Sequence, residues 1–181
     1  MKKTILKISD EEAALRSEVI RGAWLQAQHL TDRKKDDIQK ILATQFYYTW
    51  CVDTVQPTAE CYADNFEIFI MGTYVPMSPK DYSDIVLATS CNSVNSHMTH
   101  NEVCYFIDDD NAILLSKLND SLTYKDNYED FEGFGYYMNY YTRCADGVWR
   151  ISKMRDTWMK AHGLVRGVEY MFEGTVDVPE N

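Results

Sequence analysis

The chain has 181 residues, of which 45% are hydrophobic and 13% aromatic, enough for one domain with a substantial core. Its formal net charge of -10 makes nucleic acid and anionic membrane surfaces poor partners, because both are themselves negatively charged. No apolar run is long enough to span a bilayer, and the N-terminus lacks the apolar core of a secretory signal. An odd number of cysteines without a Cys-x-x-Cys pair favours reduced thiols, so we expect a cytoplasmic protein.

Residues 1–30 are predicted to form an N-terminal helical segment. Ser9 is a suitable N-cap for this helix, and Glu12 follows at the spacing of a capping box. Thr31 then caps a second helix, whose apolar residues recur at helical spacing as far as Asp53. Two long helices therefore begin the chain.

The rest of the chain changes from mixed to β-type patterning. A short helix at 58–63, strands at 65–71 and 74–75, and a helix that begins at Ser78-Pro79 are predicted first. Four long strands follow, at 96–107, 112–124, 132–144 and 147–159. The tail, residues 164–181, either adds an edge strand or packs on a partner subunit.

This order of elements predicts an α+β fold. No interdomain linker interrupts it, so residues 1–181 are expected to form a single domain. A strongly curved antiparallel sheet wrapped over the helices makes a cone-shaped barrel with one open end. A pocket is expected between the concave face of the sheet and the helices.

The segment Ser96-His97-Met98-Thr99-His100 carries two of the four histidines of the chain. The two are three residues apart in a predicted strand, so their side chains point to opposite faces and are not placed to share a metal ion. No metal site is expected. A histidine in a strand is more often structural than catalytic, and only one of these two can face the pocket.

Three further residues could accompany His97. Asp53 is at the C-terminal end of a helix, where the helix dipole disfavours a carboxylate, so it either orients a histidine or is simply solvated. Asp120 shares its strand face with Leu118, so it either has a buried partner or is turned outward by a bulge. Tyr48, five residues before Asp53, can border the same cavity from an adjacent edge of the helix.

Both faces of the strand at 132–144 are aromatic. Tyr136, Met138 and Tyr140 share one face, whereas Tyr137 lies on the other. If helices cover one face and another subunit covers the second, the protein is a homo-oligomer, a trimer or a dimer. In the strand that follows, Arg155, Asp156 and Trp158 fall where side chains could reach the mouth of the pocket.

Three stretches of the sequence carry a resemblance to a known family. They are Tyr48-x-x-Cys51-Val52-Asp53, Ser96-His97-Met98-x-His100, and Asp120 at the corresponding spacing after the histidine. Together with the order of elements and the Gly-Val-Trp-Arg-Ile entry to the last strand, they resemble the SnoaL-like branch of the NTF2-like superfamily. Within this branch the chain is similar to bile-acid dehydratases and, more distantly, to scytalone dehydratase, over roughly residues 36–160.

The resemblance implies that His97 and Asp53 form an acid/base dyad, that Tyr48 polarises a substrate carbonyl, and that Asp120 assists. The elimination chemistry of such a dyad requires no cofactor, and a homotrimer or a dimer is expected. The bile-acid dehydratases carry an arginine near the end of the last strand, where this chain has Trp158. That difference favours a neutral substrate, unless Arg155 takes the place of the arginine. The expected substrate contacts are Tyr140, Trp158, Arg155 and Leu118.

The expected activity is that of a cofactor-independent lyase, a dehydratase that acts on a cyclic hydrophobic carbonyl compound. Eliminating water beside a carbonyl requires a base for the α-proton, an acid for the leaving hydroxyl and a donor for the enolate oxygen. An isomerase or cyclase could use the same dyad. A second class of alternatives is non-catalytic, namely a ligand-binding protein or a dioxygenase β-subunit-like protein.

Overall fold

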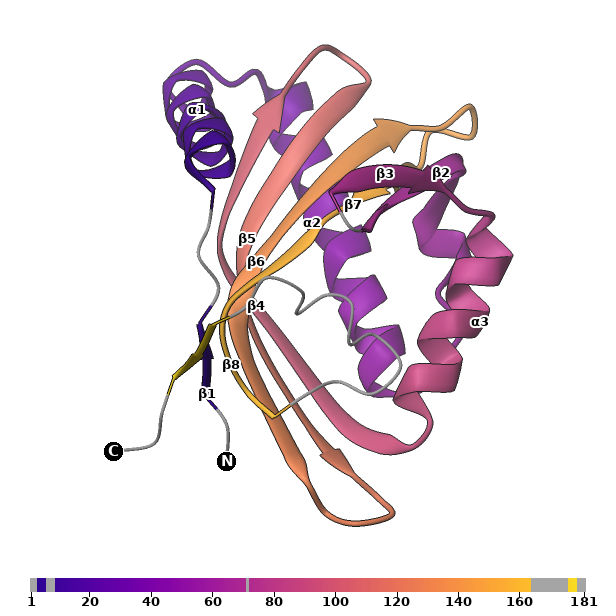
Figure 1. Cartoon of the computed structure of the whole chain (residues 1–181). Coiled ribbons are helices and arrows are strands. Elements are labelled where there is room, and N and C mark those ends of the chain that lie inside the picture. The colour runs from indigo at the N-terminus through magenta and orange to yellow at the C-terminus, as the bar shows by residue number, and fades with distance from the viewer. Residues whose placement is uncertain (1–2, 6–8, 71, 164–175, 179–181) are drawn as a thin grey trace.

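A computed structural model describes residues 3–5, 9–70, 72–163 and 176–178 of the chain. Within these residues, three α-helices pack on a curved mixed sheet (Figure 1). The helices are α1 (Asp10–Ala27), α2 (Asp32–Asp53) and α3 (Pro79–Ser90), with a short 3-10 helix, η1 (Ala59–Cys61), within the short helix predicted at 58–63. Within the described residues, no helix is both long and apolar enough to cross a membrane.

Each α-helix begins at a residue whose side chain caps it. Ser9, Thr31 and Ser78 accept hydrogen bonds from the backbone N–H three residues later, at 3.2, 3.3 and 3.1 Å. These caps confirm the predicted helix starts. The carboxylate of Glu12, however, binds Arg16 and Arg155 on the side of α1 that faces the sheet. The first cap therefore uses the hydroxyl of Ser9 and the backbone of Glu12, while the carboxylate of Glu12 ties the helix to the sheet.

Nine strands in the described part of the chain form one sheet. They are β1 (Lys3–Ile5), β2 (Tyr62–Ile70), β3 (Thr73–Pro76), β4 (Ser93–Phe106), β5 (Asn111–Tyr124), β6 (Asp130–Arg143), β7 (Trp149–Met154), β8 (Asp156–His162) and β9 (Val176–Val178). β6 is the central strand, with β5 and then β4 on one side and both β7 and β8 on the other. Beyond these, β7 pairs with β2, and β8 pairs with β1, which carries β9 at the edge.

Two features of the sheet differ from the prediction. The β2–β7 pair is parallel, whereas an antiparallel sheet was expected. A hairpin forces its two strands to be antiparallel, but β2 and β7 are far apart in the chain and no hairpin joins them. The predicted last strand is also divided into β7 and β8, although Arg155 between them still accepts a hydrogen bond from the backbone N–H of Met138 at 2.9 Å.

A bulge in β7 decides which side chains of the last two strands face inward. Tyr141 pairs with Ile151 and Tyr140 pairs with Lys153, so one extra residue, Ser152, is inserted opposite them. The buried positions consequently change from odd numbers before the bulge to even numbers after it, starting with Met154. This change of parity turns the side chains that follow toward the concave face of the sheet.

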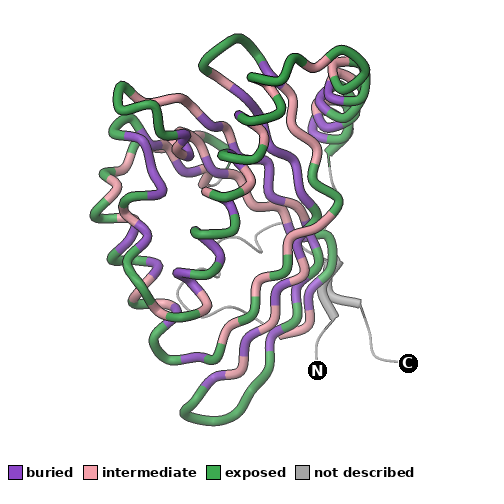
Figure 2. The backbone as a smooth tube through the Cα atoms, turned by 180° about the vertical axis from the view of Figure 1, so that it is seen from behind, coloured by how far each residue is buried: buried purple, intermediate pink, exposed green. Residues whose placement is uncertain are grey.

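Helices cover both faces of the sheet. α2 and α3 lie on the concave side, and α1 lies on the opposite, convex side (Figure 1). Val19 of α1 packs with Ile113, Leu115 and Met138, and Tyr140 lies against this cluster. The second aromatic face of β6 is therefore covered by a helix of the same chain. The buried stretches of the tube in Figure 2 follow the central strands and the inner sides of the helices.

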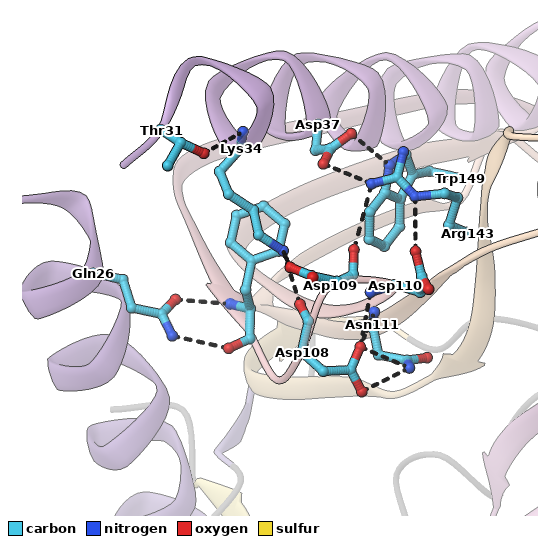
Figure 3. Close-up of polar contacts among 11 residues, drawn as sticks. Gln26, Thr31, Lys34, Asp37, Asp108, Asp109, Asp110, Asn111, Arg143 and Trp149 are labelled. Carbon is cyan, nitrogen blue, oxygen red and sulfur yellow. Dashed lines mark hydrogen bonds and ion pairs between the residues drawn. The ribbon is translucent and has the colours of Figure 1, made fainter. Parts of the chain in front are cut away.

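Polar contacts fix the positions of α1 and α2 relative to the hairpin between β4 and β5 (Figure 3). Gln26 of α1 donates to the carbonyl of Phe106 and accepts from its N–H, each at 2.9 Å. Asp37 of α2 is buried and accepts from Arg143 at 2.7 Å and from Trp149 at 3.2 Å. The bonds of Asp37 hold the first half of α2 on the sheet. From there the helix runs toward the cavity, and its C-terminal end lies next to it.

Candidate active site

A cavity of about 110 Å³ lies between α2, α3 and the concave face of the sheet. Its walls are largely apolar and are formed by residues such as Val52, Ile68 and Leu122. Its polar groups come from separate elements, namely α2, α3, β4, β5, β6 and β8. The cavity is similar in size to one that holds a benzene ring, about 150 Å³. It therefore suits a compact molecule with an apolar body.

His97 and Asp53 form the central polar pair of this cavity. The Nδ1 atom of His97 lies 2.7 Å from Asp53 Oδ1, and the backbone N–H of His97 donates to the same carboxylate at 3.0 and 3.1 Å. The end of α2 therefore binds both the backbone and the ring of one residue of β4. His97 lines the cavity, whereas Asp53 lies behind it. With Nδ1 held by the carboxylate, Nε2 is the ring nitrogen available to the cavity.

Asp120 is the partner of His97 across the β4–β5 ladder. Its side chain is 5% exposed and lines the cavity, so the predicted inward orientation is the one found. Oδ1 of Asp120 lies 3.5 Å from Nε2 of His97, which is an ion-pair distance without the alignment of a hydrogen bond. Burial raises the pKa of Asp120, although the neighbouring His97 acts in the opposite direction.

The two carboxylates determine how His97 titrates. Burial alone would lower the pKa of the imidazole, because a buried site disfavours its charged form. The charge of Asp120, together with the hydrogen bond and charge of Asp53, outweighs that effect and raises the pKa of His97 above its ordinary value. A proton taken up by Nε2 is therefore stabilised between two acidic groups.

Asp156 brings a third carboxyl group into the cavity. It is the first residue of β8 and pairs with Tyr137 of β6. It is half-buried and lines the cavity, and its Oδ1 is buried without a hydrogen-bond partner among the described residues. Burial raises the pKa of Asp156 to about 7, with His97 lowering it and Asp120 raising it further.

Tyrosine rings form one wall of the cavity. Tyr48 is 4% exposed, and its ring packs edge to face on Tyr62 and Tyr137, with centroids 6.1 and 6.2 Å apart. Burial raises the pKa of both Tyr48 and Tyr137 well above the ordinary tyrosine value. Both phenols therefore stay protonated at neutral pH and can donate hydrogen bonds to an oxygen in the cavity.

The structure brings together Tyr48, His97, Asp120 and Trp158 on the cavity wall, with Asp53 behind His97. Three of the expected substrate contacts lie elsewhere and do not line this cavity: Leu118, Tyr140 and Arg155.

Each of these three side chains has a different place in the fold. Leu118 is fully buried in the core between the sheet and α2. Tyr140 points to the convex face, where α1 covers it. Arg155 forms an ion pair with Glu12 of α1 at 2.5 Å and lies over the ring of Phe69, 4.0 Å from its centroid, without itself lining the cavity.

Asp156 and Tyr137 are among the cavity residues that were not predicted as site residues. Asp156 was placed near the pocket mouth, but its inward orientation depends on the bulge at Ser152, for which the sequence has no clear signal. Tyr137 was assigned to one face of an all-aromatic strand without a role. It shares its strand face with Asn139 and Tyr141, which bond to Gln45 of α2, and this is the concave face.

No protein-family model matches the sequence, and no curated protein matches it. Solved structures are similar to this chain at low sequence identity. One is a candidate scytalone dehydratase from Novosphingobium aromaticivorans, with 17% identity, a TM-score of 0.67, and coverage of 75% of this chain and 92% of that chain.

Two other structures widen the comparison. The hexachlorocyclohexane dehydrochlorinase LinA-type3 from Novosphingobium barchaimii is 20% identical, with a TM-score of 0.59 over 74% of this chain and 91% of that chain. The beta subunit of a candidate aromatic-ring-hydroxylating dioxygenase from Novosphingobium aromaticivorans is 16% identical, with a TM-score of 0.55 over 69% and 90%. At these identities the likeness concerns the fold alone. The chain has the SnoaL-like, NTF2-like fold, a cone-shaped α+β architecture with helices packed on a curved sheet.

Proposed function

We propose that this protein is a cofactor-independent lyase of the dehydratase type, acting on a small cyclic carbonyl compound. The observation that carries the proposal is the 2.7 Å contact between Nδ1 of His97 and Asp53 at the wall of a largely apolar cavity. A carboxylate on one ring nitrogen fixes the tautomer and makes the other nitrogen a better base. The size of the cavity favours a substrate with one ring.

The proposed reaction begins with removal of the α-proton of the substrate by Nε2 of His97. The imidazolium so formed is stabilised by Asp53 on one side and by Asp120 on the other. The negative charge that develops on the carbonyl oxygen requires a hydrogen-bond donor, and the protonated phenol of Tyr48 can supply it. The carbon–oxygen bond at the β-position then breaks, and hydroxide leaves with a proton as water.

A direct test uses β-hydroxycyclohexanone, which has one ring, an acidic α-proton and a hydroxyl leaving group. The wild-type protein is expected to form cyclohexenone, detected by its ultraviolet absorbance and by the loss of one water in the mass spectrum. His97→Gln is expected to lower kcat at least about 100-fold, because general base catalysis contributes that much or more. Glu132→Gln, an exposed change in the same sheet, is the control.

The products also distinguish the alternatives. A product of unchanged mass that depends on His97 would indicate an isomerase with the same dyad. Turnover that persists in full in His97→Gln would contradict the proposed role of the dyad. The solved dioxygenase beta subunit makes a non-catalytic role the second candidate. A stable complex with another protein, together with no turnover by the wild-type chain, would favour that role.

A further inference from the structure

Building on the proposed function, we infer that Asp156 is the acid that protonates the leaving hydroxyl of the substrate. The reaction needs such an acid, because hydroxide is a poor leaving group at neutral pH. His97 is already engaged as the base, so the donor has to be a second group that touches the substrate. Asp156 lines the cavity from β8, whereas His97 lines it from β4, and strands β5 and β6 separate them.

The surroundings of Asp156 suit a proton donor. Its Oδ1 accepts no hydrogen bond from the described residues although it is buried. A buried carboxylate in that position would be costly, whereas a protonated carboxyl is neutral and can turn its O–H toward a ligand. The titratable groups that interact with it are His97 from β4, Asp120 from β5, Tyr48 from α2, Tyr137 from β6 and Tyr62 from β2, and Tyr82 lines the same cavity from α3.

The other candidate donors are less suitable. Asp120 lies 3.5 Å from Nε2 of His97, so a proton on Asp120 is shared with the base itself. The phenols of Tyr48 and Tyr137 have pKa values raised well above that of an ordinary tyrosine, mainly through burial, which makes them weak acids. Asp156 has a pKa raised to about 7, close to the value at which a general acid is most effective in neutral solution.

The proton balance of the proposed step is complete. The α-carbon–hydrogen bond breaks and its proton goes to Nε2 of His97, while the electron pair forms the new carbon–carbon double bond. The β-carbon–oxygen bond breaks, and the oxygen leaves as water with the proton of Asp156. His97 is then protonated and Asp156 is a carboxylate. Transfer of the proton from His97 to Asp156 through water in the cavity restores the starting state.

The test compares two leaving groups in wild-type protein and in Asp156→Asn. β-Hydroxycyclohexanone needs an acid for its leaving group, whereas β-chlorocyclohexanone releases chloride without one. Asp156→Asn is expected to lower kcat about 100-fold or more on the hydroxy compound and less than about threefold on the chloro compound. The alkaline limb of its kcat/KM profile should also disappear, because no carboxyl remains to be deprotonated. Asp64→Asn, an exposed change, is the matched control.

The outcomes separate this inference from the proposed function. No elimination by wild-type protein from either compound would overturn both. Elimination by the wild type, with equal losses in Asp156→Asn on both compounds or with no loss, would overturn the role of Asp156 alone.

A measurement without substrate gives an independent check. In the ligand-free wild type, the carbon-13 NMR resonance of the Asp156 carboxyl carbon should titrate near neutral pH. This resonance is assigned because it is absent from the spectrum of Asp156→Asn. Titration at the ordinary aspartate value, about 3.9, would overturn the inference.

Discussion

Asp53 makes two kinds of contact with His97, one to the ring and one to the backbone, and they have different consequences. Asp53→Asn keeps the side-chain shape and a hydrogen-bond acceptor for the backbone N–H. It removes the charge that helps to raise the pKa of His97. We expect the acid limb of the kcat/KM profile to move to lower pH and kcat to fall by roughly 10,000-fold, as when the carboxylate of a His–Asp pair is neutralised.

The measurement is a pH–rate profile for elimination from β-hydroxycyclohexanone, paired with an NMR titration of the imidazole. Glu132→Gln serves again as an exposed control. An imidazole pKa that is unchanged or higher in Asp53→Asn would show that the charge of Asp53 does not act on His97 as described.

At the same scale, the sequence located those site residues whose orientation depends on regular geometry. His97 and Asp120 lie in strands where alternation holds, and both side chains face the cavity as expected. Asp156 and Trp158 follow the bulge at Ser152, which exchanges the inward and outward positions. Whether a strand contains an extra residue is determined by its partner strand, so alternation alone could not predict their orientation.

At the scale of elements, α2 positions Asp53 and Tyr48, and it is itself held at its other end by Asp37. Asp37 is 1% exposed, and burial alone would raise its pKa. Hydrogen bonds from Arg143 and Trp149 outweigh that effect and lower the pKa below its ordinary value (Figure 3). The charged form of Asp37 is therefore favoured in the folded protein relative to the unfolded chain.

Asp37→Asn is expected to lower the free energy of unfolding at neutral pH by about 3 kcal/mol, because one partner of a buried, hydrogen-bonded ion pair is lost. The stabilisation by Asp37 is present above its unfolded pKa, near 3.8, and is lost as the pH falls through the lower folded value. The difference in the free energy of unfolding between the wild type and Asp37→Asn should therefore shrink as the pH falls through that lower pKa. Urea unfolding at several pH values measures it. Asp36→Asn, next to it on the exposed side of the helix, should change stability by less than about 0.5 kcal/mol.

The elements also show where prediction from local patterns ends. The starts of α1, α2 and α3 depend on capping residues that can be recognised in four residues of sequence, and all three helix starts were predicted. The parallel pairing of β2 with β7 joins segments some 90 residues apart, as the pair Tyr62 and Ile151 shows. Nothing in either segment alone specifies that partner. The predicted homo-oligomer, a trimer or a dimer, likewise stays a prediction.

At the scale of the whole molecule, two glycines of β6 allow β8 to pack closely against it. A Cβ atom at Gly135 would lie 2.1 Å from the backbone carbonyl oxygen of Thr157 in β8. A Cβ atom at Gly133 would lie 2.4 Å from Cζ3 of Trp158, which is the outer edge of a side chain. Both glycines therefore permit the close approach of β8. A side chain at Gly135 would collide with backbone, whereas one at Gly133 would collide with a ring on the cavity wall.

This difference makes the pair of alanine variants a test of how the cone is built. Gly135→Ala should destabilise the protein by about 3 kcal/mol, since two backbones must separate and the β6–β8 ladder must shift. Gly133→Ala should destabilise it by about 1 kcal/mol, because the ring of Trp158 can move, and the shape of the cavity should change instead. Urea unfolding gives the stabilities, and KM for β-hydroxycyclohexanone reports on the cavity. If both variants lost equal stability with an unchanged KM, close packing of β8 on β6 would not be what shapes the site.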